Sequence, residues 1–288
     1  MRPPSRAPNF AVPMNPSFPA ETLQIEGADA STFAHAQFSS AVASLSVGRW
    51  QFSAWLDPKG RVLAFFHLAR VADDRYLLLL RGGSAATMAQ ALRRFVFRSK
   101  VSITALPPRR LASGPALSLG SLVRESLDTA AATDDNAIIS FGCDSHSLVI
   151  NHTDDDAWRL MQLRNGWPWL TEASLGELLP PALSLQRLHA VAVDKGCYPG
   201  QEIVARMHFR GGHKRHLHCV TLSQAESAGS ALLQDGREVG RVLDVVATGT
   251  GHEALAVLSD ELAAQANDGS PLTLDNGVAI TLLSSWPA

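Results

Sequence analysis

One segment, residues 194–206 (DKGCYPGQEIVAR), concentrates side chains that can do chemistry. It holds a thiol, an ammonium, a phenol, an amide, carboxylates and a guanidinium within 13 residues. Gly196 and Gly200 bracket Cys197, which predicts tight backbone turns that display the thiol on a loop. The residues that follow predict a short helix, so Cys197 would lie just before a helix N-terminus. A thiol in that position, with Lys195 close by, is expected to be nucleophilic or able to bind a metal.

Cys197 also has a purely structural interpretation, because unpaired cysteines are often small members of a buried core. The flanking glycines and the dense polar side chains favour the functional interpretation. We therefore expect the thiol to act together with its neighbours in the segment, which are Lys195, Tyr198, Gln201 and Glu202.

A second polar cluster follows, formed by His208, His213, His216, His218 and Cys219. Imidazoles and thiolates suit zinc or iron, but this spacing matches no structural zinc pattern. A strand over 216–222 would also turn Cys219 away from its neighbouring histidines. We therefore expect no metal site here. The loop 206–215 is basic and either contacts phosphate, RNA or a folate polyglutamate tail, or is an ordinary solvated loop.

The composition of the 288-residue chain describes a globular protein with ample material for a core. Apolar residues make up 46% and charged residues 18%, which excludes disorder for most of the chain. The formal charge of −2 excludes a protein that coats nucleic acid, so a nucleic acid is expected only at the 206–215 loop. No apolar run approaches the roughly 20 residues that cross a bilayer. Three widely spaced cysteines predict a reducing, cytoplasmic location.

Hydrophobic periodicity and turn residues predict an α+β chain. Six prolines interrupt residues 1–20 and indicate an extended arm, not a signal peptide. Apolar spacing predicts a helix over 29–47, and the sequence DPKG at 57–60 predicts a β-hairpin. The predicted parts are the arm at 1–20, a region at 21–215 with lobes at approximately 21–106 and 107–215, and an antiparallel β-barrel at 216–288.

The chain also resembles a known family. Residues 195–198 (KGCY), 200–202 (GQE) and Arg206 match the K-G-C-[FY]-x-G-Q-E signature of the YgfZ-type folate-binding proteins. These are relatives of the T-protein (aminomethyltransferase) of the glycine cleavage system. The resemblance covers nearly the whole chain after residue 20. Further matching segments are Phe33–Phe38 with Gln37 at the family's Gln, Leu56–Leu63, Val96–Ile103 and Gly240–Val242.

The resemblance implies two interleaved T-protein-like α+β lobes and a C-terminal β-barrel around a central channel that holds tetrahydrofolate. It also implies a role in the assembly or repair of iron–sulfur proteins, including an enzyme that modifies transfer RNA, with Cys197 as the functional thiol. The folate-binding positions carried over from the family are Gln37, Lys195, Gly196, Gly200, Arg206 and Arg164.

Three segments depart from the pattern of the T-protein. Ala64 and Phe65 replace its catalytic carboxylate, which argues against aminomethyltransferase activity. Arg164 replaces the pterin-binding Glu, and a guanidinium cannot accept hydrogen bonds from an aminopyrimidine edge. Pro181 replaces an amide side chain of the family's I-P-Q segment. The alternatives to a folate-dependent accessory factor are therefore a one-carbon transferase on tetrahydrofolate and a cofactor-free module that binds RNA or a client protein.

Overall fold

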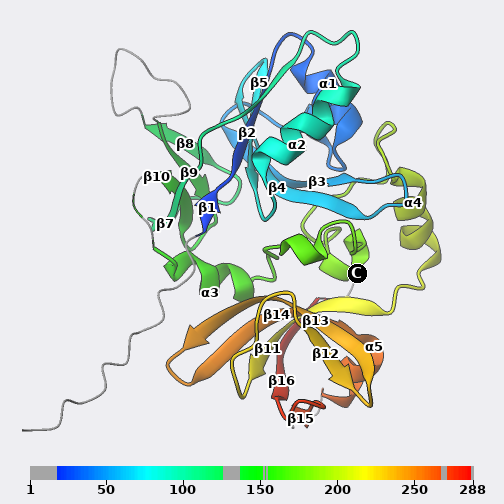
Figure 1. The fold of residues 1–288 in the computed structure, drawn as a ribbon. Coiled ribbons are helices and arrows are strands. Elements are labelled where there is room, and N and C mark those ends of the chain that lie inside the picture. The colour runs from blue at the N-terminus through cyan, green and yellow to red at the C-terminus, as the bar shows by residue number, and fades with distance from the viewer. Residues whose placement is uncertain (1–17, 126–136, 152, 154, 267–270, 287–288) are drawn as a thin grey trace, which may run out of the picture.

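A computed structural model describes residues 18–125, 137–151, 153, 155–266 and 271–286 (Figure 1). This part of the chain forms three antiparallel sheets joined by short helices. Most of the predicted arm at 1–20 lies outside the described residues. The α-helices are α1 (Ala30–Gln37), α2 (Ala85–Leu92), α3 (Ala157–Arg164), α4 (Gln201–Arg210) and α5 (Asp260–Gln265), and the 3-10 turns are η1 (Val42–Ser44), η2 (Arg93–Phe95), η3 (Glu172–Ser174) and η4 (Pro180–Leu183).

The first sheet has the order β3-β4-β5-β2-β6. Its strands are β2 (Thr22–Glu26), β3 (Arg49–Leu56), β4 (Val62–Ala72), β5 (Arg75–Leu80) and β6 (Ser102–Ala105). The second sheet has the order β1-β7-β10-β9-β8, with strands β1 (Pro19–Ala20), β7 (Arg109–Gly114), β8 (Leu122–Glu125), β9 (Ile138–Gly142) and β10 (Ser147–Asn151).

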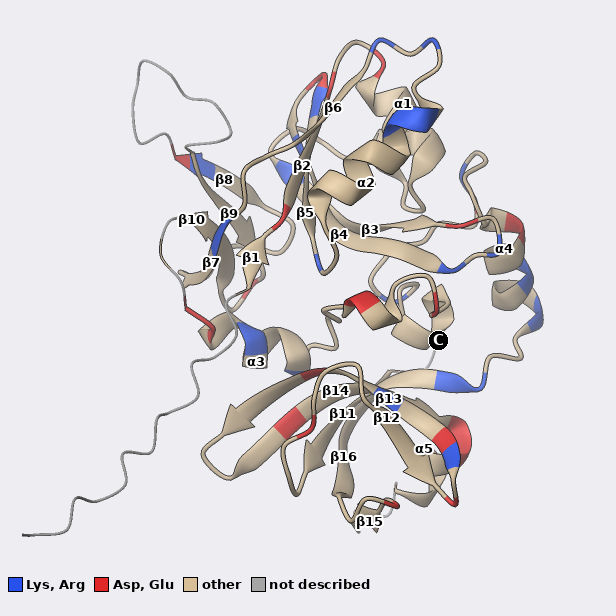
Figure 2. Ribbon diagram, viewed as in Figure 1, with Lys and Arg blue, Asp and Glu red and all other residues tan. Residues whose placement is uncertain are grey.

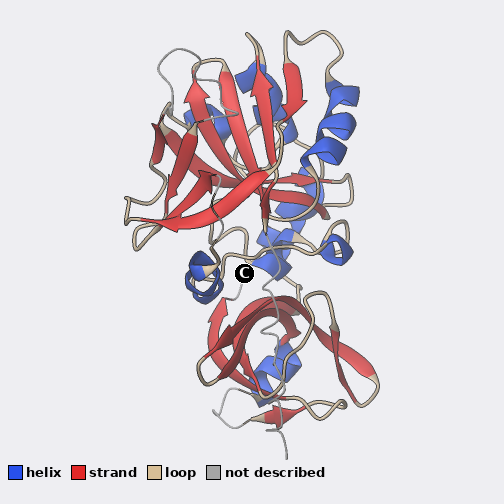
Figure 3. Ribbon diagram, turned by 60° about the vertical axis from the view of Figure 1, so that its left-hand side comes forward, coloured by secondary structure: helices blue, strands red, loops and turns tan. Residues whose placement is uncertain are grey.

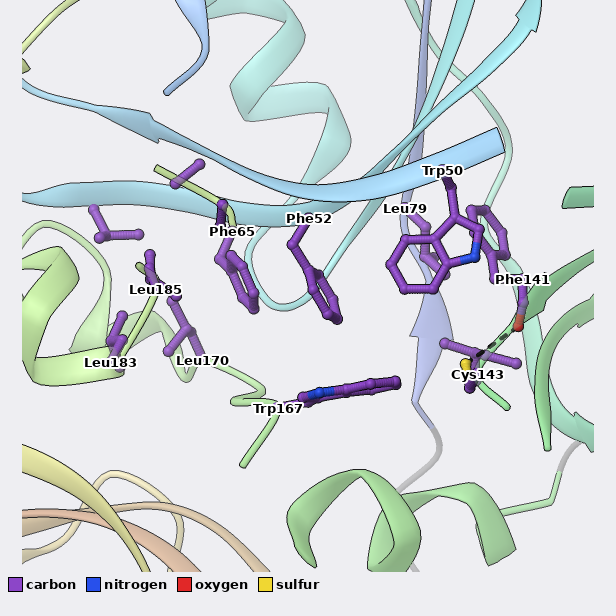
Figure 4. Close-up of a cluster of buried hydrophobic side chains, with 14 of the residues drawn as sticks. Trp50, Phe52, Phe65, Leu79, Phe141, Cys143, Trp167, Leu170, Leu183 and Leu185 are labelled. Atoms are coloured by element: carbon purple, nitrogen blue, oxygen red, sulfur yellow. Dashed lines mark hydrogen bonds between the residues drawn. The ribbon is translucent and has the colours of Figure 1, made fainter. Parts of the chain in front are cut away.

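The first sheet is buried on both faces. Side chains alternate along β5, so Tyr76 and Leu78 join the core beneath α1 and α2, whereas Leu77 and Leu79 face the second sheet. This burial explains why the run at 77–80 consists of leucines only. Figure 4 shows the shared core between the sheets, where Trp50, Phe52 and Phe65 project from β3 and β4 toward Trp167.

The third sheet has the order β12-β13-β14-β11-β16-β15. Its strands are β11 (Arg215–Leu222), β12 (Ala231–Gln234), β13 (Arg237–Thr248), β14 (Gly251–Ser259), β15 (Leu272–Thr273) and β16 (Ala279–Trp286). Register shifts in three of its strand pairs increase the local twist, and the sheet curls strongly (Figure 3). It remains a half-barrel, because its two edge strands, β12 and β15, do not pair with each other within the described residues.

The mixed, sheet-rich fold class predicted from the sequence is confirmed, and the C-terminal barrel is corrected to a curled half-barrel. The hairpin at 57–60 is confirmed as the turn between β3 and β4. The predicted helix over 29–47 is wrong beyond Gln37, because Phe38 is extended and bridges to Trp55. No helix in the described ranges has the length and apolar character needed to span a membrane.

His67 of β4 is buried between aromatic rings and makes the fold sensitive to acid. Its ring centroid lies 4.5 Å from that of Trp50 and 4.8 Å from that of Phe52. Burial, and secondly the charge of Arg81, holds the pKa of His67 well below its ordinary value of 6.5. The unfolded chain therefore takes up a proton below about pH 6.5 that the folded chain does not, so the unfolding free energy falls as the pH drops.

We expect His67→Phe to flatten this pH dependence, because phenylalanine keeps the aromatic packing and cannot bind a proton. Below about pH 6.5 the unfolding free energy of the variant should fall less steeply, by up to about 1.4 kcal/mol per pH unit. Urea unfolding between about pH 5 and pH 7 measures the two slopes. Parallel slopes for the variant and the wild type would contradict this role of His67. Buried His218 keeps a residual slope in both proteins, because burial lowers its pKa to about 4.

Candidate functional site

The loop that carries Cys197 is anchored by Lys195. The Lys195 Nζ donates hydrogen bonds to the carbonyl oxygens of His35 at 2.6 Å, Phe38 at 2.5 Å and Ser40 at 2.9 Å. These bonds use all three donors of an ammonium group. They also satisfy carbonyls at the end of α1, where the helix dipole favours a cation. Burial lowers the pKa of Lys195 to about 8, so the amine is mainly protonated at neutral pH.

Two further side chains of the signature hold the same loop from within. Tyr198 is buried, and its hydroxyl donates to the Ala192 carbonyl at 2.9 Å. Burial raises the pKa of Tyr198 to about 12, which keeps the phenol neutral. Gln201 Nε2 donates to the Lys195 carbonyl at 3.0 Å. The loop is therefore closed on itself before α4 begins.

A close contact between two glycines fixes the loop against the β3–β4 hairpin. Gly200 has φ +78°, and a Cβ at this position would lie 2.5 Å from the Asp57 carbonyl oxygen and 2.8 Å from the Gly60 Cα. Gly60 has φ +79°, and a Cβ there would lie 3.1 Å from the Ile203 Cβ of α4. Residues 56–63 and 195–206, which the sequence analysis named as two separate segments, therefore pack against each other.

Cys197 differs from Lys195 and Tyr198, because it is exposed. The other two cysteines are buried, and burial raises the pKa of both Cys143 and Cys219 to about 12. Gly196 and Glu202 are also exposed, as is Arg206 one turn further along α4. The loop thus presents one thiol at the surface while Lys195 and Tyr198 face inward.

The structure brings His35 of α1 to this loop, which the sequence analysis did not foresee. A Cβ on Gly196 would lie 4.0 Å from His35 Nε2. Burial, and secondly the charge of Lys195, lowers the pKa of His35, which favours a neutral imidazole. The predicted folate residue Gln37 lies at the end of the same helix, and its Oε1 is a buried acceptor with no hydrogen-bond partner within the described residues. Only the three-dimensional contact reveals His35, since its helix precedes the loop by about 160 residues.

The positions that the resemblance aligns with T-protein carboxylates make other contacts in this structure. Phe65 is fully buried and stacks on Phe52 with ring centroids 5.2 Å apart. Arg164 forms a two-pronged ion pair with Glu253 of β14, with Nε donating to Oε2 at 2.7 Å. The Arg164 guanidinium therefore ties α3 to the third sheet. Pro181 is buried in η4.

An aromatic cavity of about 450 Å³ opens between the first sheet and residues 187–189. Trp50, Phe52 and Trp167 line it together with the cations Arg49 and Arg187. Arg187 Nη2 donates to the Gly166 carbonyl at 2.8 Å, and the guanidinium lies over the Trp286 ring at 5.2 Å from its centroid. The indole planes of Trp50 and Trp167 stand 82° apart and both side chains are largely buried, so the cavity offers mainly its two cations to a ligand that carries negative charge.

The histidine cluster after α4 divides between separate contacts. His216 Nδ1 lies 2.6 Å from Asp260 Oδ1, and His218 Nδ1 lies 2.9 Å from Ser285 Oγ. Cys219 is buried in the central core on the neighbouring position of β11. In the part of the chain that the structure describes, no three His, Cys, Asp or Glu side chains are placed to hold a metal ion.

No family model matches the chain. The tRNA-modifying protein YgfZ of Aliivibrio fischeri is 28% identical over 268 residues, which cover 82% of this chain and 81% of that protein. The tRNA-modifying protein YgfZ of Escherichia coli is 26% identical over 266 residues, with 81% of each chain covered. The crystal structure of the glycine cleavage system aminomethyltransferase T from Bartonella henselae superposes with a TM-score of 0.64 at 16% identity, over 92% of this chain and 82% of that one.

The chain is similar in sequence to proteins named tRNA-modifying protein YgfZ and similar in fold to the glycine cleavage T-protein. The resemblance predicted from the signature is therefore confirmed. The match in structure concerns the fold, whereas the matches in sequence extend to relatives named for transfer RNA modification. The residues of the signature and the β3–β4 hairpin pack together through Gly200 and Gly60.

Proposed function

We propose that this protein is a tetrahydrofolate-binding accessory factor in the assembly or repair of iron–sulfur proteins, linked to transfer RNA modification, and that it acts in the cytoplasm. The observation that supports the proposal is the difference in exposure among the side chains of residues 195–202, which carry the signature. Lys195, Tyr198 and Gln201 hold the backbone, whereas Cys197 is exposed to a partner. The relatives named tRNA-modifying protein YgfZ support the link to transfer RNA modification.

A preorganised thiol suits contact with a client protein. Because the loop is tied to α1 and to the β3–β4 hairpin, little conformational entropy is lost when a partner approaches Cys197. The neutral imidazole of His35 lies beside Gly196 and is positioned to accept a proton from a group bound near the thiol. The exposed carboxylate of Glu202 adds polar contact area next to the loop.

The aromatic cavity fits a folate better than the positions carried over from the T-protein. Phe65 and Arg164 offer no acceptor for the aminopyrimidine edge of a pterin. The planar ring would lie at the rim that Trp50 and Trp167 border, and Arg49 and Arg187 would hold the glutamate carboxylates. Bound tetrahydrofolate would supply a carrier for a one-carbon unit.

Titration of tetrahydrofolate by calorimetry, with tryptophan fluorescence in parallel, tests the cofactor. We expect one saturable site and quenching of the indole emission, because Trp50 and Trp167 line the cavity. Arg49→Gln should weaken binding about tenfold through the lost charge-assisted hydrogen bond. Arg61→Gln, another exposed arginine of the β3–β4 hairpin region, is the matched control and should bind normally. Absence of saturable binding to the wild type would refute the cofactor assignment, and unchanged binding by Arg49→Gln would refute the choice of cavity.

The one-carbon transferase is the weaker candidate. Ala64 is buried and Phe65 is packed into the shared core, so neither position offers a group that takes up a proton. A transferase would therefore need a base from elsewhere in the chain.

A further inference from the structure

The segment at residues 93–100 (RRFVFRSK) presents an unusual surface. It follows α2 and contains four cationic residues and no acidic one. Phe97 is 86% exposed and Phe95 is 48% exposed. Among the large apolar side chains of the described ranges, Phe97 is the most exposed. Contiguous exposed aromatic area on a protein surface is typical of a binding site.

The backbone of this segment is held in place, so the display of the phenylalanines is built into the fold. Lys100 N donates to Asp29 Oδ2 at 2.7 Å, and Arg93 Nη2 donates to the Ile103 carbonyl at 2.8 Å. Val96 packs on the core beneath α2, which turns the side chains on both sides of it outward. The Arg98 guanidinium lies over the Phe97 ring at 5.5 Å from its centroid.

A continuous path of contacts connects this segment to the Cys197 loop. The ring of Phe95 lies 6.4 Å from that of Trp55, centroid to centroid. Trp55 pairs with Phe38 in an isolated β-bridge, and the Phe38 carbonyl accepts a hydrogen bond from Lys195 Nζ at 2.5 Å. Figure 2 shows Lys and Arg in blue along the connection between α2 and β6 and along α4. The 93–100 segment therefore lies on the side of the first sheet to which the Cys197 loop is attached.

We propose that the 93–100 segment binds single-stranded RNA. Bases of an unpaired strand stack on exposed phenylalanine rings, and Arg94, Arg98 and Lys100 flank those rings in the sequence, where they could contact phosphates. A pair of exposed aromatic residues with cationic residues on both sides, and no acid within the segment, is the pattern expected for a strand whose backbone is anionic and whose bases are apolar. The preference for RNA over another polyanion rests on the proposed link to transfer RNA modification.

Fluorescence anisotropy with a labelled, unstructured RNA of about twelve nucleotides tests the proposal with the full-length protein. Phe97→Ala should weaken binding about tenfold, which is the range for loss of one base–aromatic stack. Arg94→Gln combined with Arg98→Gln should lower the slope of log affinity against log salt by about 1.4, since each phosphate contact to a single strand contributes about 0.7. Leu283→Ala is the matched control, because Leu283 of β16 is 49% exposed and lies on the third sheet.

Two results would overturn the proposal. The first is an RNA affinity of Phe97→Ala equal to that of the wild type. If Phe209→Ala on α4 weakens binding instead, the RNA site would be the basic 206–215 loop. The second is the absence of saturable RNA binding by the wild type, which would assign the aromatic surface to a protein partner. The proposed function is tested separately. If the protein still restores the activity of an iron–sulfur client, and this activity still requires Cys197, the proposed function stands after either result.

Discussion

Replacement of Cys197 by Ser is expected to abolish support of an iron–sulfur client while leaving stability nearly unchanged. Cys197 is exposed, so the unfolding free energy should change by no more than about 0.5 kcal/mol. The loop itself should persist, because its anchors are the side chains of Lys195, Tyr198 and Gln201. The measurement is client enzyme activity in cells that lack the natural protein and carry the variant.

The two buried cysteines are the matched controls. Cys143→Ser and Cys219→Ser remove thiols from the central core, so they should lower stability but keep client activity for the protein that folds. In the native state a disulfide reagent should modify one thiol rapidly, and that reaction should vanish in Cys197→Ser. Full rescue by Cys197→Ser and by Cys197→Ala would reduce Cys197 to a structural residue.

Gly200→Ala is expected to destabilise the protein by about 2–4 kcal/mol. Part of the loss comes from φ +78°, which costs an L-residue roughly 1–2 kcal/mol. The rest comes from the new Cβ, which would meet the Asp57 carbonyl oxygen at 2.5 Å and the Gly60 Cα at 2.8 Å. Both are backbone atoms, so the loop and the hairpin must separate. Urea unfolding of both proteins measures the loss in unfolding free energy, provided that the variant and the wild type have the same m-value.

Gly277→Ala separates the two contributions. Gly277 precedes β16 with φ +80°, and nothing lies within 4 Å of the place its Cβ would take. Its replacement should therefore cost only the conformational part, about 1–2 kcal/mol. Equal losses at the two glycines would show that the contact between Gly200 and the hairpin contributes nothing. A client activity of Gly200→Ala below that of Gly277→Ala would further link the contact to the presentation of Cys197.

Turns and strands that depend on one segment of the chain were predicted correctly from local signals in the sequence. The DPKG turn needs only its own residues, because Asp57 Oδ1 accepts the backbone N–H groups of Lys59 and Arg61 at 2.8 Å. The leucine run of β5 likewise indicates a strand, although an uninterrupted apolar run does not by itself show that both faces of the sheet are buried. The signature at 195–202 predicted the resemblance to YgfZ-type proteins, because a long motif carries more information than composition.

The tertiary structure alone decided where the predicted helix over 29–47 ends and what Lys195 does. Apolar spacing continues past Gln37, but the carbonyls of Phe38 and Ser40 turn to Lys195, about 155 residues later in the chain. Such a contact has no local signal, since it depends on packing between distant segments. The same reason explains why the sequence did not reveal His35 beside the Cys197 loop.

The sequence by itself therefore determined the resemblance to YgfZ-type proteins, the mixed fold class and the segment that carries the thiol. Only the tertiary structure decided which members of that segment face inward and which face outward, because burial depends on the hairpin and on α1. It also placed the two positions that the resemblance aligns with T-protein carboxylates, with Phe65 in the core and Arg164 paired to Glu253. The sequence gives the chemical type of each side chain. The exposure and the partners of a side chain depend on contacts between segments that lie far apart in the chain.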